Sequence, residues 1–230
     1  DGAKLTPEKP VTLTWDNGQG LKFSRVLQLD DEYMITVTQR VENSGSTTVT
    51  LYPYGRVVRV GRPKTLGYFI LHEGLIGVVN GVKDEKTYAK VDEAIDGKIE
   101  NESVGGWLGI TDKYWMAAVV PDQTLPIKGL FTHRVDNNID LYQSSFIASN
   151  GLELAPGGSI ESRDHAFAGA KVVKMLAQYG EAIDGKAPGI QGFDLAIDWG
   201  WFYFLTKPIF YLLDYIYGLG EAGEAARNAT

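Results

Sequence analysis

Most of the chain alternates between hydrophobic and polar positions with the period of two that is typical of β-strands. Residues 33–42 (YMITVTQRVE) show this alternation, which predicts one strand with one buried face. Turn residues follow at 43–46 (NSGS) and a second β-rich run at 47–60, so the two runs are predicted to pair as a hairpin. Further runs of the same kind lie at 66–79, 105–121, 129–135, 139–149 and 161–170.

The short strands, separated by Gly and Asx residues, predict a mainly β fold, a large antiparallel β-sandwich rather than alternating βαβ units. We expect two packed, mainly antiparallel sheets over residues 10 to 170 or so. Helical spacing is found near the C-terminus, so helices are expected at 168–185 and 198–218.

Three segments are expected along the chain. Residues 1–187 form the β-sandwich domain with a packed C-terminal helix, and residues 188–220 form a linker and an amphipathic helix after a Gly- and Pro-rich stretch. Residues 221–230 (EAGEAARNAT) are small and polar, which favours a disordered tail or a cloning scar.

The segment 199–218 (WGWFYFLTKPIFYLLDYIYG) is rich in aromatic residues. A membrane-spanning helix needs roughly 20 apolar residues to cross about 30 Å of hydrocarbon. Here Lys207 and Asp214 interrupt the apolar run, and a charge near the membrane centre costs a few kcal/mol. Pro208 is expected to bend the helix or to end its first half near Leu205, because it removes one backbone donor. A full membrane span is therefore not expected.

On a helix, this segment has one narrow polar stripe that includes Lys207, Tyr211 and Asp214. A wide apolar face opposite such a stripe is typical of a helix that lies in the membrane–water interface. A core helix docked on the sandwich would also have such a face, so both interpretations stay open here. The expected membrane-interface residues are Trp199, Trp201, Phe202, Phe204, Leu205, Ile209, Phe210, Leu212, Leu213 and Ile216.

Composition narrows the function further. The net charge of −7 and the absence of a basic cluster argue against nucleic acid as a partner. The chain has no cysteine, which excludes disulfides and thiolate chemistry and agrees with an oxidising compartment such as the periplasm. The first ten residues show no signal peptide, so we expect either a cytosolic protein or a targeting segment upstream.

No catalytic, cofactor or metal site is predicted. His72, His133 and His165 are far apart in sequence and lack metal-ligand spacing, so surface or structural roles are expected. Asp164 precedes His165, but neighbours on a strand point to opposite faces, which argues against a proton relay. The chain is therefore expected not to be an enzyme.

Three stretches together resemble the periplasmic part of the YidC family of bacterial membrane protein insertases. They are GGWLGITDKYWMAAVVP at 105–121, FAGAKVVKML at 167–176 and FDLAIDWGWFYFLTKPIFYLLDYIYG at 193–218. LYPYGRVVRVG at 51–61 is also similar to that family. The resemblance extends over nearly the whole chain up to Gly220.

The resemblance implies a β-supersandwich similar to sugar mutarotases, followed by an interfacial helix on the periplasmic side of the inner membrane. It implies a non-catalytic domain of an insertase and chaperone that acts alone or with the Sec translocon and its accessory subunits. Nascent membrane proteins would be bound by transmembrane parts that this stretch lacks, and the excerpt itself is expected to be water-soluble. The alternative is a carbohydrate-binding or mutarotase-like sandwich, which a cleft with convergent carboxylates and histidines would favour.

Overall fold

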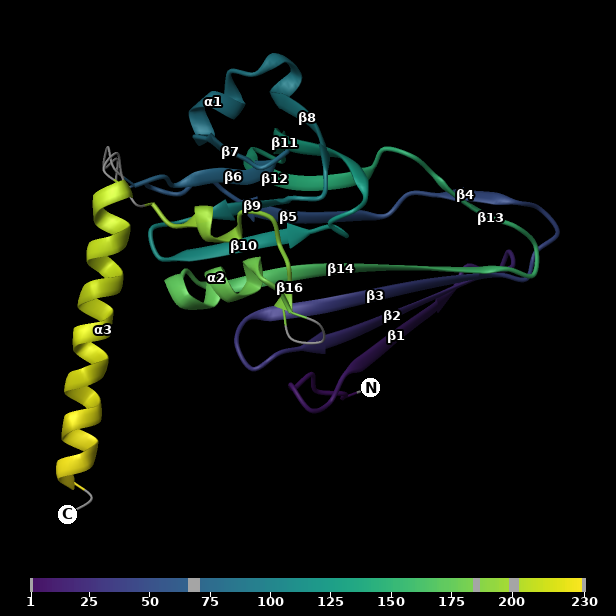
Figure 1. The fold of residues 1–230 in the computed structure, drawn as a ribbon. Coiled ribbons are helices and arrows are strands. Elements are labelled where there is room, and N and C mark those ends of the chain that lie inside the picture. The colour runs from purple at the N-terminus through teal and green to yellow at the C-terminus, as the bar shows by residue number, and fades with distance from the viewer. Residues whose placement is uncertain (1, 66–70, 184–186, 199–202, 229–230) are drawn as a thin grey trace.

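The computed structural model describes residues 2–65, 71–183, 187–198 and 203–228. Within these ranges, side chains at 182–188, 203–204 and 218–228 are not described. Two antiparallel sheets pack face to face, and helices cover one end of the sandwich (Figure 1). The predicted mainly β sandwich with C-terminal helices is confirmed.

The larger sheet has eight strands, and every neighbouring pair in it is antiparallel. In spatial order they are β1 (Val11–Asp16), β2 (Leu21–Leu29), β3 (Met34–Asn43), β14 (Ser159–Ala170), β10 (Trp115–Val120), β9 (Trp107–Thr111), β6 (Gly74–Val79) and β7 (Val82–Lys86). The smaller sheet contains, in order, β5 (Tyr54–Val60), β12 (Ile139–Ala148), β11 (Pro126–Asp136) and β8 (Lys98–Val104). Two short ribbons pair β4 (Val49–Leu51) with β13 (Leu152–Leu154) and β15 (Ala182–Ile183) with β16 (Ala187–Pro188).

The larger sheet is covered on both faces at its centre, which explains why every residue of β9 is buried. Leu108 and Ile110 point toward the smaller sheet and share a core with Phe131. Trp107 points the other way, toward helices α2 (Val173–Gly180) and η2 (Phe193–Ala196). Successive side chains on a strand alternate between faces, so one strand contributes to both cores.

The predicted hairpin of residues 33–42 with 47–60 is wrong. Both edges of β3 are occupied, by β2 on one side and by β14 on the other. β5 instead pairs with β12 in the smaller sheet. The turn is fixed by Asn43, whose side-chain amide donates to the carbonyl oxygens of Thr47 (2.9 Å) and Leu154 (3.1 Å). The alternation predicted both strands, but it carries no information on the partner of each.

The helices also differ from the prediction. A short helix, α1 (Tyr88–Asp92), and the 3-10 turn η1 (Ile95–Gly97) lie between β7 and β8. The Thr87 hydroxyl caps α1 by accepting from the backbone N–H of Lys90 at 3.3 Å. Five residues are too few to show a helical period, so α1 could not be predicted from its local pattern.

The last helix, α3 (Tyr203–Asn228), continues beyond residue 218 and includes residues 221–228. Glu and Ala, which are strong helix formers, favour this extension into the segment expected to be a tail or a cloning scar. α3 also runs through Pro208 without ending near Leu205, since proline removes only one backbone donor. A bend at Pro208 stays a prediction. Among the described residues, no helix is long and apolar enough to cross a bilayer.

Candidate functional site

The apolar side of α3 faces away from the sandwich. Between Leu205 and Tyr217, nine large apolar or aromatic side chains are 36% to 67% exposed. We refer to them as the exposed face of α3: Leu205, Ile209, Phe210, Tyr211, Leu212, Leu213, Tyr215, Ile216 and Tyr217. Phe210 and Tyr211 are the least exposed of the nine, which places them at the borders of this face.

The polar stripe of α3 faces the sandwich domain. The Lys207 ammonium lies 3.0 Å from a carboxylate oxygen of Asp194 in η2. Seven residues later, on the same side of the helix, the Asp214 carboxylate lies 2.6 Å from the Lys174 ammonium in α2. Lys207 and Asp214 of the predicted stripe therefore bind the domain, whereas Tyr211 is on the exposed face of α3.

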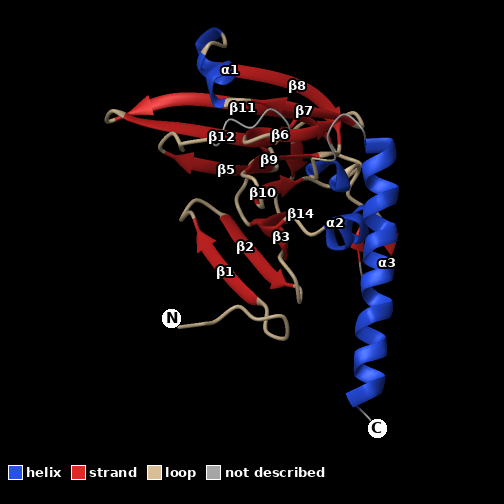
Figure 2. Cartoon of the chain, turned by 90° about the vertical axis from the view of Figure 1, so that its left-hand side faces the viewer, coloured by secondary structure: helices blue, strands red, loops and turns tan. Residues whose placement is uncertain are grey.

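This arrangement is the reverse of an ordinary surface helix, which buries its apolar stripe and exposes its polar one. Figures 1 and 2 show α3 running along one end of the sandwich and extending past it. The core-helix interpretation is therefore wrong for residues 205–217. A continuous exposed apolar surface marks a site of contact with a membrane or another molecule.

The structure places six of the ten predicted membrane-interface side chains on the exposed face of α3: Leu205, Ile209, Phe210, Leu212, Leu213 and Ile216. Phe204 is part of the helix, but its side chain is not described. Trp199, Trp201 and Phe202 lie outside the described residues.

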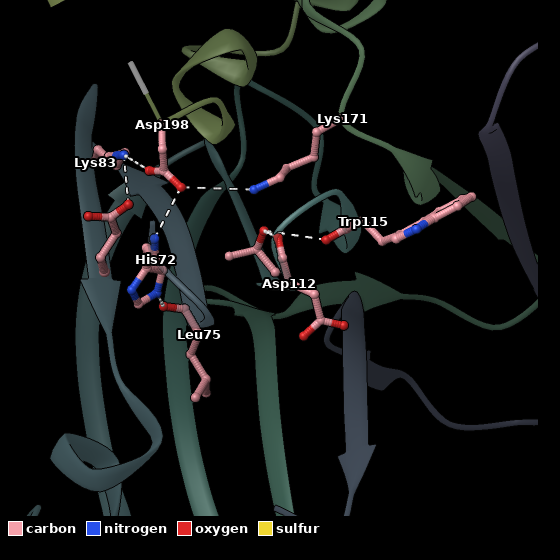
Figure 3. A network of polar contacts seen from close by, with 9 residues as sticks. His72, Leu75, Lys83, Asp112, Trp115, Lys171 and Asp198 are labelled. Atoms are coloured by element: carbon pink, nitrogen blue, oxygen red, sulfur yellow. Dashed lines mark hydrogen bonds and ion pairs between the residues drawn. The ribbon is translucent and has the colours of Figure 1, made fainter. Parts of the chain in front are cut away.

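Asp198 connects the sandwich to the segment that leads into α3 (Figure 3). One of its carboxylate oxygens accepts a hydrogen bond from the backbone N–H of His72 at 3.2 Å, and the other lies 3.2 Å from the Lys83 ammonium. The Lys171 ammonium lies 4.0 Å from the Asp198 carboxylate. These contacts join β7, the segment just before β6 and the residue that follows β14 to a single side chain, and we call them the Asp198 hub.

The hub is largely shielded from water, because the side chains of Asp198 and Lys171 are only 11% and 5% exposed. Burial lowers the pKa of Lys171, and the Asp198 carboxylate opposes that shift. The Lys83 ammonium also contacts the Glu85 carboxylate at 2.6 Å. The hub could not be predicted from the sequence, since its members are separated by up to 126 residues and no local pattern links them.

The three histidines have structural partners. His72 shares a hydrogen bond of 3.0 Å between Nε2 and the Leu75 carbonyl oxygen. His165 Nδ1 lies 3.2 Å from the Thr36 hydroxyl, and burial followed by the Arg163 charge lowers the pKa of His165. Asp164 instead accepts from the Gln39 amide at 3.2 Å, so Asp164 and His165 point to opposite faces as predicted.

His133 connects α1 to the smaller sheet. Its ring stacks on Tyr142 with a centroid distance of 4.7 Å. Its Nδ1 lies 3.2 Å from Asp92, and its Nε2 lies 2.9 Å from Asp140. The Tyr142 hydroxyl donates to the same Asp92 at 2.9 Å. This cluster fixes the end of α1 on the sheet, which is a structural role.

Two grooves of the sandwich can be compared with the cleft of carboxylates and histidines that a carbohydrate-binding or mutarotase-like protein would have. The first, about 530 Å³, is lined mainly by apolar and aromatic side chains and contains no histidine. The second, about 620 Å³, contains His165, Asp30 and Asp122. Asp30 accepts from the backbone N–H groups of Glu32 and Met34, and Asp122 accepts from Thr124, so both carboxylates stabilise turns. Within the described residues, no group of three His, Asp or Glu side chains is placed to hold a metal ion.

Comparison with known proteins gives one consistent result. The family model of the YidC periplasmic domain matches residues 1–212. The membrane protein insertase YidC of Methylorubrum extorquens is 48% identical over 95% of this chain and 36% of its own length. The insertase YidC of Granulibacter bethesdensis is 46% identical over 98% of this chain and 39% of its own length. The chain thus spans little more than a third of the length of these relatives.

Solved structures were matched at lower similarity. A galactose mutarotase related enzyme from Lactobacillus acidophilus is 10% identical, with a TM-score of 0.45 over 70% of this chain and 68% of that enzyme.

Proposed function

This chain belongs to the YidC periplasmic domain family, and from that membership we propose that it serves a membrane protein insertase as a non-catalytic periplasmic domain. In this proposal, residues 199–218 lie on the periplasmic surface of the bacterial inner membrane. The insertion of nascent membrane proteins, alone or with the Sec translocon and its accessory subunits, is the task of the longer protein.

The observation that carries this proposal is the orientation of α3. Its charged side chains Lys207 and Asp214 are paired with the sandwich domain, while its apolar side chains face outward. A helix of this kind needs an apolar partner on its outer side, and the membrane interface accepts aromatic rings at its polar boundary.

The energetics agree with measurable membrane binding. Fully burying one large apolar side chain stabilises by about 1.5–3 kcal/mol, and insertion into an interface gains part of that amount. Several residues of the exposed face acting together therefore suffice for partitioning. The two exposed ion pairs that hold α3 to the domain contribute about 0–1 kcal/mol each.

The domain is proposed to be non-catalytic because its histidines and groove carboxylates already have structural partners. We expect no anomerisation of glucose or galactose above the buffer rate in a polarimetric assay. Activity that His165→Ala abolishes without lowering the melting temperature would contradict this part of the proposal.

Vesicle flotation tests the membrane contact. The triple variant Leu205→Ser, Leu212→Ser, Leu213→Ser should no longer float with vesicles of phosphatidylethanolamine and phosphatidylglycerol, and its melting temperature should stay nearly unchanged. A matched control, Leu13→Ser, Val60→Ser, Val135→Ser, removes equally exposed apolar side chains from strands and should float like the parent. Equal loss of flotation in both triple variants, or flotation of the α3 variant, would overturn the proposal.

A further inference from the structure

A second exposed apolar surface lies at the turn between β9 and β10. Tyr114 in this turn and Trp115, the first residue of β10, are 63% and 58% exposed, and Val172, just before α2, is 48% exposed. The backbone N–H of Lys171 donates to the carbonyl oxygen of Tyr114 at 2.8 Å, which places Val172 next to the turn. We call Tyr114, Trp115 and Val172 the turn patch.

The turn patch lies at the same end of the sandwich as α3. Lys171 binds the turn through its backbone and approaches the Asp198 carboxylate through its ammonium at 4.0 Å. Lys171 therefore links the turn to Asp198, and Asp198 precedes α3 by five residues. In Figure 1 the turn between β9 and β10 projects at the left-hand end, along which α3 runs.

The chemistry of the turn suits the boundary between lipid and water. Trp and Tyr rings favour this boundary, where one end of the ring is in apolar surroundings and the other is hydrated. The Lys113 ammonium lies 4.8 Å from the centre of the Tyr114 ring, so a cation accompanies the aromatic group. Lysine can keep its charge among lipid headgroups while its methylene stem stays in apolar surroundings.

The size of the patch argues against a protein partner. An aromatic side chain buries about 150–250 Å² when wholly covered. Two such side chains and one valine therefore fall short of the roughly 800 Å² per partner that a stable protein–protein interface buries. Contact with a lipid surface does not need this minimum area, because the turn patch would add to the larger contact made by the exposed face of α3.

We propose that the turn patch is a second point of contact with the same lipid surface on which α3 lies. The proposal rests on the membrane contact of α3 stated above. A single helix in the interface leaves the sandwich free to rotate about the helix axis, and a second contact away from this axis fixes that rotation. The turn between β9 and β10 would thus set the angle at which the sandwich stands on the membrane.

Site-specific fluorescence tests this proposal, because the chain has no cysteine and a single introduced cysteine can be labelled uniquely. Three variants, Tyr114→Cys, Leu213→Cys and Tyr52→Cys, each receive an environment-sensitive dye. Tyr52 is 51% exposed and lines the groove between the larger sheet and the β4–β13 ribbon, so it is the matched control. Vesicles of phosphatidylethanolamine and phosphatidylglycerol should shift the emission at positions 114 and 213 to the blue and leave position 52 unchanged.

The outcomes separate the two proposals. A shift at 213 without a shift at 114 overturns the turn contact and leaves the α3 contact standing. No shift at either position overturns both, and a shift at all three positions shows non-specific adsorption and overturns the turn contact. A shift at 114 that appears without vesicles as the protein concentration rises shows contact with a second copy, which also overturns it.

Discussion

Helices α2 and α3 have apolar faces of similar chemistry, but the face of α2 is buried and that of α3 is exposed. In α2, Met175, Leu176 and Tyr179 are at most 5% exposed. In α3, Leu212 and Leu213 are 57% and 61% exposed. The exposed fractions of Leu176 and Leu213 thus differ by more than half, although the sequence around each predicts an amphipathic helix.

What each helix contacts explains the difference. The Tyr179 ring of α2 packs edge-on against Phe167 and Phe193, and its hydroxyl donates to the Asp30 carboxylate. α3 instead contacts the same region through the charges of Lys207 and Asp214. Periodicity therefore shows that a helix has an apolar face, and only the contacts of its charged side chains, here with Asp194 and Lys174, show which side the protein covers.

The largest expected effect contrasts one leucine of each helix. Leu176→Ala removes a wholly buried side chain and should lower the free energy of unfolding by about 2–5 kcal/mol. Leu213→Ala should change it by no more than about 0.5 kcal/mol. Urea unfolding without lipid measures both values. Similar losses in the two variants would show that α3, like α2, is packed in the core.

A smaller effect is expected at the attachment of α3. Asp198→Ala removes charged hydrogen bonds and leaves Lys171 buried, which should lower the free energy of unfolding by about 1.5–3 kcal/mol. The control Asp214→Ala breaks an exposed pair and should cost no more than about 1 kcal/mol. If Asp214→Ala costs more than Asp198→Ala in the same urea experiment, the hub is not the main attachment.

The third effect depends on pH and concerns α2. Burial, together with the Asp30 carboxylate, raises the pKa of Tyr179 above its ordinary value of 10.0. The unfolded chain then ionises at a lower pH than the folded one, so this contribution to stability is fully present below pH 10 and is lost as the pH rises further. The free energy of unfolding should fall by at most about 1.4 kcal/mol per pH unit from this one group.

The variant Tyr179→Phe isolates this contribution and should lose stability less steeply above pH 10. Tyr88, whose pKa burial raises to about 12, is present in both proteins, so its effect cancels in the comparison. Parallel curves for the parent and the variant would show that ionisation of Tyr179 is not coupled to the docking of α2.

Much of the fold could be predicted from the sequence, because a buried face leaves a local period of two or of about 3.6. β6, β9, β10 and β12 all fall within predicted runs, and β11 and β14 overlap predicted runs but begin two or three residues earlier. The pairing of β5 with β12 could not be predicted, since about 80 residues separate the two strands and the pattern of each fits several partners. The same limit applies to the Asp198 hub, because the three residues that contact the Asp198 carboxylate lie far from it in the sequence.

The candidate site was predicted in part. The period of Lys207, Tyr211 and Asp214 identified a stripe, and the structure places Lys207 and Asp214 against the domain. Their partners Asp194 and Lys174 gave no sequence signal, because a surface charge with a long-range partner resembles one that faces only water. The extension of α3 to Asn228 was missed although the Ala- and Glu-rich composition of that segment favours a helix.

A cysteine scan along α3 tests the central claim most directly. Single cysteines at positions 205, 207, 209, 212, 213, 214 and 216 are labelled with the environment-sensitive dye, and emission is recorded with and without vesicles of phosphatidylethanolamine and phosphatidylglycerol. We predict blue shifts at 205, 209, 212, 213 and 216, where the parent side chains are exposed, and none at 207 and 214, where they are paired with the domain. Shifts at 207 and 214 with none at 212 and 213 would contradict it.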